Sequence, residues 1–339
     1  MFGAVASIVA AILCGGVLLT ADVYVHTRVQ TLGGVNVWGY RGPAVGRKQP
    51  RERRVVVLGG STAFGYGLPW NEAFPFYLER AVNARGTSGC VTRVINLGAP
   101  GQGAFGFRFD LDDYAYLRYD VAVLYEGYND LGASDLPEAV PLRYEQNRLL
   151  WRRQSPIFAW TGYFPILPLV LREKAMSLRA GGDLDGAYRG RVTFEPGLRV
   201  RTTAAAMQRA ADVADAVGRT LGRLRPDVAA DAAHRVDTVT WLPYTTAVVD
   251  GIRAARAHGA AVLIVTQPYA SDAHVAQQRT LAAVVSQSFH GDPSVGYVNL
   301  GPILNIRNRQ VAYDGLHLTA RANAVVAEAL TEPVLRMLQ

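Results

Sequence analysis

One stretch decides the fold of this chain: Val55-Val56-Val57-Leu58-Gly59-Gly60-Ser61-Thr62-Ala63-Phe64-Gly65-Tyr66-Gly67. Four apolar residues lead into two glycines, a serine and further glycines, and this pattern predicts a buried strand that ends in a tight loop. In an open parallel sheet, ligands bind where the strands end at their carboxyl edge. Ser61 is therefore expected at the mouth of a site.

Strand and helix patterns alternate from residue 55 onward. This alternation predicts an α/β sheet with helices on both faces. The expected strands are 55–59, 92–97, 120–125, 261–266 and 295–299, and the expected helices are 71–85, 103–117, 241–258, 271–289 and 319–338. The last helix shows one apolar face, because Val326, Leu330, Val334 and Leu338 follow one another at four-residue steps, and Thr319 can cap it.

The alternation breaks between about residues 132 and 240, which we interpret as an insertion because a minimal fold needs only a short crossover there. Its first half combines aromatic and aliphatic residues with arginines, a mixture that suits a lid, a membrane-surface contact or a satellite core. These residues are Trp151, Phe158, Trp160, Tyr163, Phe164, Ile166, Leu167, Leu169 and Val170, with Arg143, Arg148, Arg152 and Arg153. The second half, 203–224, is rich in alanine and predicts a helix.

Composition limits the classes of protein to consider. The 339 residues can form one large domain or two ordinary ones, and the 50% hydrophobic content is enough for a core. Cys14 and Cys90 are the two cysteines, so no disulfide framework is predicted. The net charge of +7 suits an anionic membrane surface. No nucleic-acid recognition motif is present, and a nucleic-acid partner is not expected.

The amino-terminal segment suggests a membrane helix. Residues 2–21 carry no charge, and about 20 apolar residues are enough for one helical bilayer crossing. We interpret residues 1–27 as a retained transmembrane anchor. A cleaved signal peptide is the alternative, but no Lys or Arg precedes the apolar run and no clear small-x-small cleavage site follows it. Cys14 is a poor lipid-attachment site because Leu13 before it is bulky.

Residues 28–54 are rich in glycine, proline and arginine, and they are interpreted as a basic juxtamembrane linker, a solvated connector that touches lipid head groups. No Lys or Arg precedes residue 28, whereas seven of them follow between residues 28 and 54: Arg28, Arg41, Arg47, Lys48, Arg51, Arg53 and Arg54. By the positive-inside rule, this bias places the downstream domain in the cytoplasm.

Two familiar interpretations of the loop around Ser61 fail. A phosphate-binding loop requires G-x-x-x-x-G-K-[ST], and no such lysine is present. The nucleophile elbow of the α/β-hydrolases requires G-x-S-x-G, and Ala63 occupies the position of its last glycine.

A base for Ser61 is available near the carboxyl terminus, in Tyr313-Asp314-Gly315-Leu316-His317-Leu318-Thr319. A serine hydroxyl needs a nearby base to become a nucleophile, and histidine suits that role. A carboxylate three residues earlier, across a glycine turn, can hold the ring in one tautomer. A lone Asp-x-x-His is more often a helix-capping loop. The other histidines, at 26, 234, 258, 274 and 290, lack a comparable setting.

Acyl transfer also needs hydrogen-bond donors for an oxyanion, and two strand ends supply candidates. Residues 94–103 form a strand followed by a glycine-rich loop with free N–H groups, and residues 121–130 form another that ends with the amide of Asn129. Each segment also fits an ordinary turn. Glu126 and Asp130 could suggest a metal, but no cluster of His or Cys accompanies them, so no metal is predicted.

Together these segments resemble the SGNH, or GDSL-like, hydrolase superfamily. The match lies at Gly60-Ser61, at residues 96–101, at residues 127–130 and at residues 314–317, in order and at successive strand ends. The resemblance implies a flavodoxin-like three-layer sandwich with five parallel strands. Gly60 departs from the pattern, because it replaces the aspartate of the G-D-S form.

The resemblance also implies roles for individual residues. Ser61 would be the nucleophile, His317 the general base and Asp314 its orienting partner. The backbone N–H groups of Ser61 and Gly101 would form the oxyanion hole with the side-chain amide of Asn129. Gly101, rather than Gly98, follows from its spacing after Asn96.

The segment 36–43 also looks like the approach to the first block in membrane-anchored bacterial relatives, which mostly act outside the cytoplasm on acylated glycans or other esters. This resemblance opposes the charge bias, and we give it more weight.

The sequence therefore predicts a membrane-anchored serine esterase whose catalytic domain comprises residues 55–339. The enzyme is expected to need no cofactor and to act on acylated small molecules or glycans through an acyl-enzyme. One alternative is an O-acyltransferase acting on a cell-envelope polysaccharide, which would use the same residues. Another is a non-catalytic carbohydrate-binding protein on the same fold, against which the complete residue set argues. The acyl group, the alcohol and the oligomeric state do not follow from the sequence.

Overall fold

The computed structural model describes residues 2–86, 89–131, 152, 155–183, 193–222 and 241–339. The chain divides into two compact units. Unit 1 consists of Met1–Gly39 and Val140–Ala230, and unit 2 of Tyr40–Ala139 and Asp231–Gln339. Of the insertion residues named above, Arg143, Arg148, Trp151 and Arg153 lie outside the described part of the chain.

A five-stranded parallel sheet forms the centre of unit 2. Its strands are β1 (Glu52–Gly59), β2 (Val91–Asn96), β3 (Val121–Tyr125), β4 (Ala261–Thr266) and β5 (Val295–Asn299), in the order β2-β1-β3-β4-β5. All four pairings are parallel, and Val55 of β1, for example, pairs with both Val94 and Val121. This is the strand order of flavodoxin-like folds, in which the chain reverses direction across the sheet beside the first strand.

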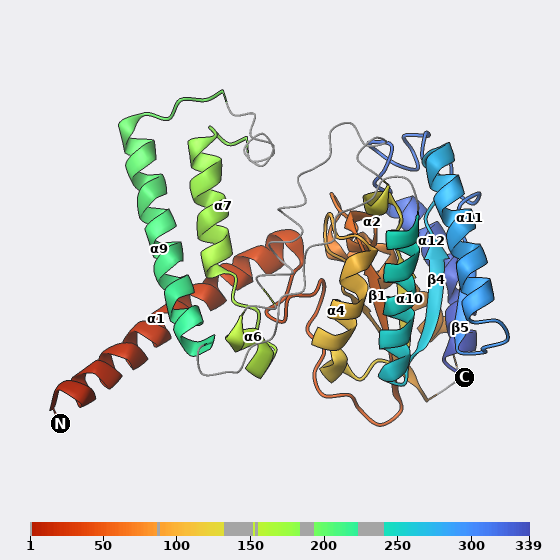
Figure 1. Ribbon diagram of the computed structural model, residues 1–339, viewed down its shortest axis with the longest axis horizontal. Coiled ribbons are helices and arrows are strands. Elements are labelled where there is room, and N and C mark those ends of the chain that lie inside the picture. The colour runs from red at the N-terminus through yellow and green to blue at the C-terminus, as the bar shows by residue number, and fades with distance from the viewer. Residues whose placement is uncertain (1, 87–88, 132–151, 153–154, 184–192, 223–240) are drawn as a thin grey trace. The chain divides into compact units, whose positions relative to one another are not determined.

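Helices cover both faces of this sheet. The helices of unit 2 are α2 (Ser61–Phe64), α3 (Phe74–Arg85), α4 (Phe107–Asp113), α10 (Leu242–Ala257), α11 (Asp272–Ser288) and α12 (Ala320–Met337). On one face, apolar residues of α3 and α12, such as Leu78 and Val326, pack on Val57 and Val123 in a shared core. On the other face, α4 and α10 lie in front of the sheet in Figure 1. The close approach of these two helices depends on Gly251, because a Cβ there would lie 2.9 Å from Phe107 Cβ.

The predicted α/β sandwich is thus confirmed, and each strand begins within three residues of its expected start. Two helices are shorter than expected. The segment 103–117 forms α4 between two single 3₁₀ turns, Ala104–Gly106 and Ala115–Leu117. The segment 71–85 begins with a 3₁₀ turn, Trp70–Glu72, and α3 starts only at Phe74 because Pro75 lacks the N–H that a position further inside the helix would need.

Unit 1 contains the amino-terminal helix and the helices of the insertion: α1 (Phe2–Gly33), α6 (Pro156–Thr161), α7 (Leu167–Arg179) and α9 (Leu198–Gly222). Asp22 of α1 is buried and accepts hydrogen bonds from the backbone N–H groups of Ile166 and Leu167, at 2.9 and 2.5 Å, and from the Tyr163 hydroxyl. His26, one turn later, contacts the Phe164 carbonyl through Nε2 at 2.6 Å. These contacts cap the start of α7, so α1 packs on the insertion from Asp22 onward.

Among the described residues, one helix is long and apolar enough to cross a membrane. The qualifying segment is Ile12–Gln30, 19 residues near the amino terminus, within α1. A signal sequence passes the same test.

The predicted basic linker, residues 28–54, is less solvated than expected, and its ends are regular, since residues 28–33 belong to α1 and residues 52–54 to β1. Arg41 and Arg54 are 5% and 2% exposed. The Arg41 guanidinium donates to the carbonyl oxygens of Phe64, Gly65 and Leu68, directly after α2, and burial lowers its pKa to about 10. These residues are buried because the carbonyl groups of a loop without regular structure need donors. Arg41 therefore belongs to unit 2 and supports the loop behind Ser61.

Candidate active site

Ser61 lies where β1 leaves the sheet and is the first residue of α2. The turn needs Gly59, whose φ of 157° is accompanied by a close approach of the chain to the carbonyl of Tyr125 in β3. The Ser61 carbonyl accepts the backbone N–H groups of Gly65 and Tyr66, each at 3.0 Å, which fixes the short helix. The predicted position of Ser61 at the carboxyl edge of the sheet is therefore observed.

The structure brings Ser61, His317 and Asp314 together. Ser61 Oγ lies 2.8 Å from His317 Nε2, and His317 Nδ1 lies 2.5 Å from Asp314 Oδ2. A carboxylate can only accept, so the ring proton is on Nδ1 and Nε2 offers a lone pair to the serine hydroxyl. The hydroxyl thus donates to the nitrogen that could remove its proton.

Asp314 is held in a turn that leaves one oxygen for the ring. Its Oδ1 accepts the backbone N–H groups of Leu316 and His317, at 3.0 and 2.7 Å. Partial burial opposes ionisation, but the hydrogen bonds from the His317 ring and from these two amides outweigh it and hold the pKa of Asp314 below its ordinary value. The carboxylate is therefore charged at neutral pH, as an orienting partner for a histidine must be.

The residues expected to bind an oxyanion come from three loops. Ser61 N is in the first turn of α2, where backbone N–H groups have no partner within the helix. Asn129 Nδ2 donates to the Gln102 carbonyl at 3.0 Å, beside Gly101 in the loop after β2. A Cβ on Gly60 would clash with this same Nδ2, so the amide lies directly against the residue before Ser61.

The loop after β2 distinguishes its two candidate glycines. The N–H of Gly98 donates to Asn96 Oδ1 at 3.0 Å, and Gly98 packs so closely on α2 that a Cβ there would lie 2.7 Å from Phe64 N. Its N–H is therefore occupied. Gly101 has a φ of 76°, which favours glycine, and lies in the turn that carries Gln102. The geometry is consistent with the choice of Gly101.

Two acids, one of them buried, flank Asn129 and were not assigned a role from the sequence. Glu126 is 3% exposed, and Asp130 accepts the Ala104 N–H through both carboxylate oxygens, at 3.2 and 2.9 Å. Burial raises the pKa of both groups, and the charge of Glu126 raises that of Asp130 further. The higher pKa values lower the average negative charge beside Asn129. The described residues contain no group of three or more His, Cys, Asp or Glu placed to hold a metal ion.

Two tyrosines at the mouth were also missed. Tyr66 and Tyr313 are 50% and 38% exposed, and their rings lie 5.0 and 6.0 Å from the His317 ring, centroid to centroid. The Tyr313 hydroxyl donates to the Tyr66 carbonyl at 2.9 Å, which joins the two loops. Their positions in the sequence could have indicated this, because each tyrosine lies within five residues of a candidate site residue.

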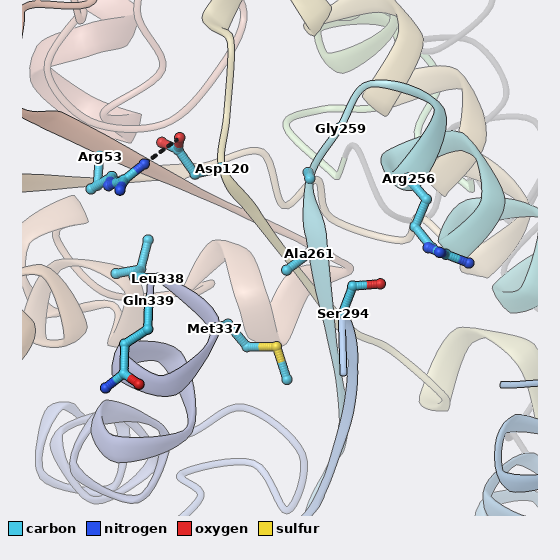
Figure 2. Close-up of a pocket in the computed structure, with 10 residues that line it drawn as sticks. Arg53, Asp120, Arg256, Gly259, Ala261, Ser294, Met337, Leu338 and Gln339 are labelled. Carbon is cyan, nitrogen blue, oxygen red and sulfur yellow. Dashed lines mark hydrogen bonds and ion pairs between the residues drawn. The ribbon is translucent and has the colours of Figure 1, made fainter. Parts of the chain in front are cut away.

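A hollow elsewhere in unit 2 is separate from this site. Figure 2 shows that it is lined by Arg53, Asp120 and Ala261, together with the end of α12. These residues lie at the amino ends of β1, β3 and β4, whereas Ser61 follows the carboxyl end of β1. None of Ser61, Asp314 and His317 lines it.

Comparisons with known proteins find similarity in structure only. No protein-family model matches the chain, and no curated protein matches it. An acetylxylan esterase from Geobacillus stearothermophilus aligns at 10% identity over 83% of this chain and 94% of its own, with a TM-score of 0.44. A family 3 carbohydrate esterase from Clostridium thermocellum aligns at 13% identity over 85% of this chain and 98% of its own, with a TM-score of 0.43.

A third solved structure is a G-D-S-L family protein from Desulfitobacterium hafniense DCB-2 to which lipolytic activity is ascribed. It aligns at 10% identity over 82% of this chain and 98% of its own, with a TM-score of 0.42.

Proposed function

We propose that this chain is a serine esterase of the SGNH type. One observation carries the proposal: the Ser61 hydroxyl, the His317 ring and the Asp314 carboxylate form a continuous hydrogen-bonded chain, 2.8 and 2.5 Å long at its two links. Ser61 and His317 are 256 residues apart. If residues 314–317 formed only a helix-capping turn, no serine so distant in the sequence would be needed beside His317.

The reaction follows from this arrangement. Ser61 Oγ attacks the ester carbonyl as its proton passes to His317 Nε2, and the positive ring is stabilised by Asp314. The carbonyl oxygen becomes an oxyanion that accepts hydrogen bonds from Ser61 N, Gly101 N and Asn129 Nδ2. The C–O bond then breaks, His317 returns its proton to the leaving alcohol, and an acyl-enzyme remains. Water, deprotonated by His317, releases the acid and restores the serine.

The exposed mouth favours a substrate whose alcohol part is a sugar. Tyr66 and Tyr313 present aromatic rings beside the histidine that protonates the alcohol. The C–H face of a sugar ring packs on such aromatic surfaces, and phenol hydroxyls can bond its hydroxyl groups. We therefore propose a short acyl ester, such as an O-acetyl group, on a glycan.

Activity assays of the wild-type protein test this function. It is expected to hydrolyse a p-nitrophenyl acetate, butyrate and octanoate panel, fastest on the short chains, and to react with a fluorophosphonate probe. With an acetylated oligosaccharide and an excess of unacetylated acceptor, an esterase releases mainly free acid. Acetylated acceptor formed faster than free acid would instead assign an O-acyltransferase, and a wild type inert toward all substrates and the probe would contradict both enzymes.

Replacing Tyr66 by alanine tests the sugar platform. We expect KM for an acetylated oligosaccharide to rise about fivefold, because a lost aromatic contact is worth about 1 kcal/mol. KM for methyl acetate, which has no ring to stack, should stay within twofold. Y66F keeps the ring and serves as the matched control. An equal rise in KM on both substrates for Y66A would contradict the platform and indicate disturbance of His317.

We also propose that α1 anchors the protein in a membrane with unit 2 outside the cytoplasm. The uncharged residues 2–21 are long enough to span a bilayer, and the buried contacts of Asp22 begin directly after them.

Protease added to sealed, right-side-out spheroplasts should cleave unit 2, whereas it should not reach unit 2 in inverted vesicles. The opposite result would show that the arginines after α1 set the topology, in accordance with the positive-inside rule. Release of the full-length protein by carbonate washing would contradict the anchor.

A further inference from the structure

A buried carboxyl group lies directly behind the proposed oxyanion hole. Glu126 Oε1 accepts the backbone N–H groups of Gly127 and Asn129, at 2.9 and 3.0 Å, and Oε2 lies 3.3 Å from Asn129 Nδ2. The backbone N–H of Gly60 donates to the same carboxyl group. One carboxyl therefore contacts the backbone and the side chain of Asn129 and the residue before Ser61.

The space beside Gly60 is occupied by this carboxyl. A Cβ at position 60 would lie 2.5 Å from Glu126 Oε2, closer still to Asn129 Nδ2, and 3.1 Å from the Gln102 carbonyl. The φ of Gly60 is −84°, outside the left-handed region. Glycine is therefore required here by the neighbouring side chains and not by its own backbone angle.

We propose that Glu126 is a positioning residue, which supplies from the end of β3 the carboxyl group that aligns Asn129 toward the oxyanion. The G-D-S form of the first block carries a carboxyl at position 60, where this chain has glycine. Glu126 fills that position from another strand. The inference rests on the proposed esterase function, and it adds a residue to which the sequence resemblance gives no role.

The contacts of Asn129 explain why alignment matters. Its amide has two hydrogens, one toward the Gln102 carbonyl at 3.0 Å and one toward Glu126 Oε2 at 3.3 Å. A developing oxyanion can take over the longer contact, so Glu126 holds Asn129 chiefly through its backbone N–H, at 3.0 Å. Without Glu126 the loop that carries the amide loses this acceptor, and a displacement of about 1 Å in a catalytic group can lower the rate about 10²-fold.

The first test replaces the carboxyl group by an amide. Both oxygens of Glu126 accept N–H groups, so E126Q points its own NH₂ at a donor whichever way it is turned. We expect kcat on p-nitrophenyl acetate to fall between about 10-fold and 10²-fold with KM within twofold. E52Q is the matched control, because Glu52 also accepts a backbone N–H but lies at the opposite end of the sheet. Its kcat should be unchanged.

The second test shortens the side chain and keeps its carboxyl group. E126D retains two acceptor oxygens for the N–H groups of this loop, whereas E126A removes both. We expect kcat of E126D on p-nitrophenyl acetate to be at least fivefold above that of E126A, a rescue that loss of side-chain volume alone would not produce.

The outcomes separate this inference from the proposed function. A wild type that neither reacts with the fluorophosphonate nor hydrolyses any ester overturns both. An active wild type with E126Q retaining kcat within twofold overturns the role of Glu126 alone. If E126Q does not fold, the shortened side chain decides: equal kcat values for E126D and E126A overturn the inference, and a higher kcat for E126D supports it.

Discussion

Replacing Ser61 by alanine is expected to abolish turnover and labelling by fluorophosphonates. The substitution removes the hydroxyl oxygen that is proposed to bond the acyl group, and His317 Nε2 is left without its 2.8 Å partner. Loss of a serine nucleophile lowers kcat on the order of 10⁶-fold in other hydrolases. The measurements are kcat for p-nitrophenyl acetate and in-gel labelling of the purified full-length protein.

The S61A protein should remain folded, because a single hydroxyl hydrogen bond contributes only about 0.5–1.5 kcal/mol. S294A is the matched control. Ser294 also donates a hydroxyl, to Asp292 Oδ1 at 2.6 Å, but lies beside the hollow at the amino edge of the sheet. It should be labelled and should turn over like the wild type. Residual labelling of S61A at the wild-type rate would place the nucleophile at another residue.

The residues that could be foreseen are those whose position depends on local pattern and on one rule of topology. Four apolar residues before Gly59 predicted a buried strand, and the carboxyl edge of a parallel sheet then predicted where Ser61 would lie. The same rule predicted that the loops after β2 and β3 would come close to it. The short distance from Asp314 to His317 predicted their contact, because three residues across a glycine turn bring the two side chains together.

The residues that could not be foreseen depend on contacts between distant loops. Glu126 follows an apolar strand, and a charged residue there suggests solvent or a metal until the space beside Gly60 is known. Tyr66 and Tyr313 are 247 residues apart, and their shared hydrogen bond exists only in the folded chain. Arg41 resembled a solvated linker residue because its acceptors, the carbonyls after α2, have no side-chain signature.

The contact of Asp22 with the start of α7 is a second example of an interaction between distant segments that the sequence does not predict. An acidic residue directly after an apolar segment predicts the end of a membrane span. That its carboxylate would bind backbone N–H groups 144 and 145 residues away requires the insertion to fold against α1. Periodicity within either segment contains no information about this contact.

Replacing Asp314 by asparagine has the second largest expected effect, about 10³–10⁴-fold in kcat. Asp314 Oδ1 already accepts two backbone N–H groups, so the asparagine oxygen stays there and its NH₂ faces His317 Nδ1. Two donors cannot pair, and the ring must move its proton to Nε2. That nitrogen then cannot accept from Ser61. The measurement is kcat for p-nitrophenyl acetate, with fluorophosphonate labelling slowed to a similar degree.

The pH dependence and a matched variant sharpen this prediction. The pKa of Asp314 is held below its ordinary value, so its carboxylate contributes at every pH above that value and is lost only as the pH falls through the lowered pKa. Protonation of Asp314 should therefore not limit kcat of the wild type above about pH 5. D292N removes a carboxylate that likewise accepts a backbone N–H two residues later, and it should keep kcat. A loss below about tenfold in D314N would reduce Asp314 to a residue that only shapes the turn, because a histidine in the correct tautomer would then not depend on its charge.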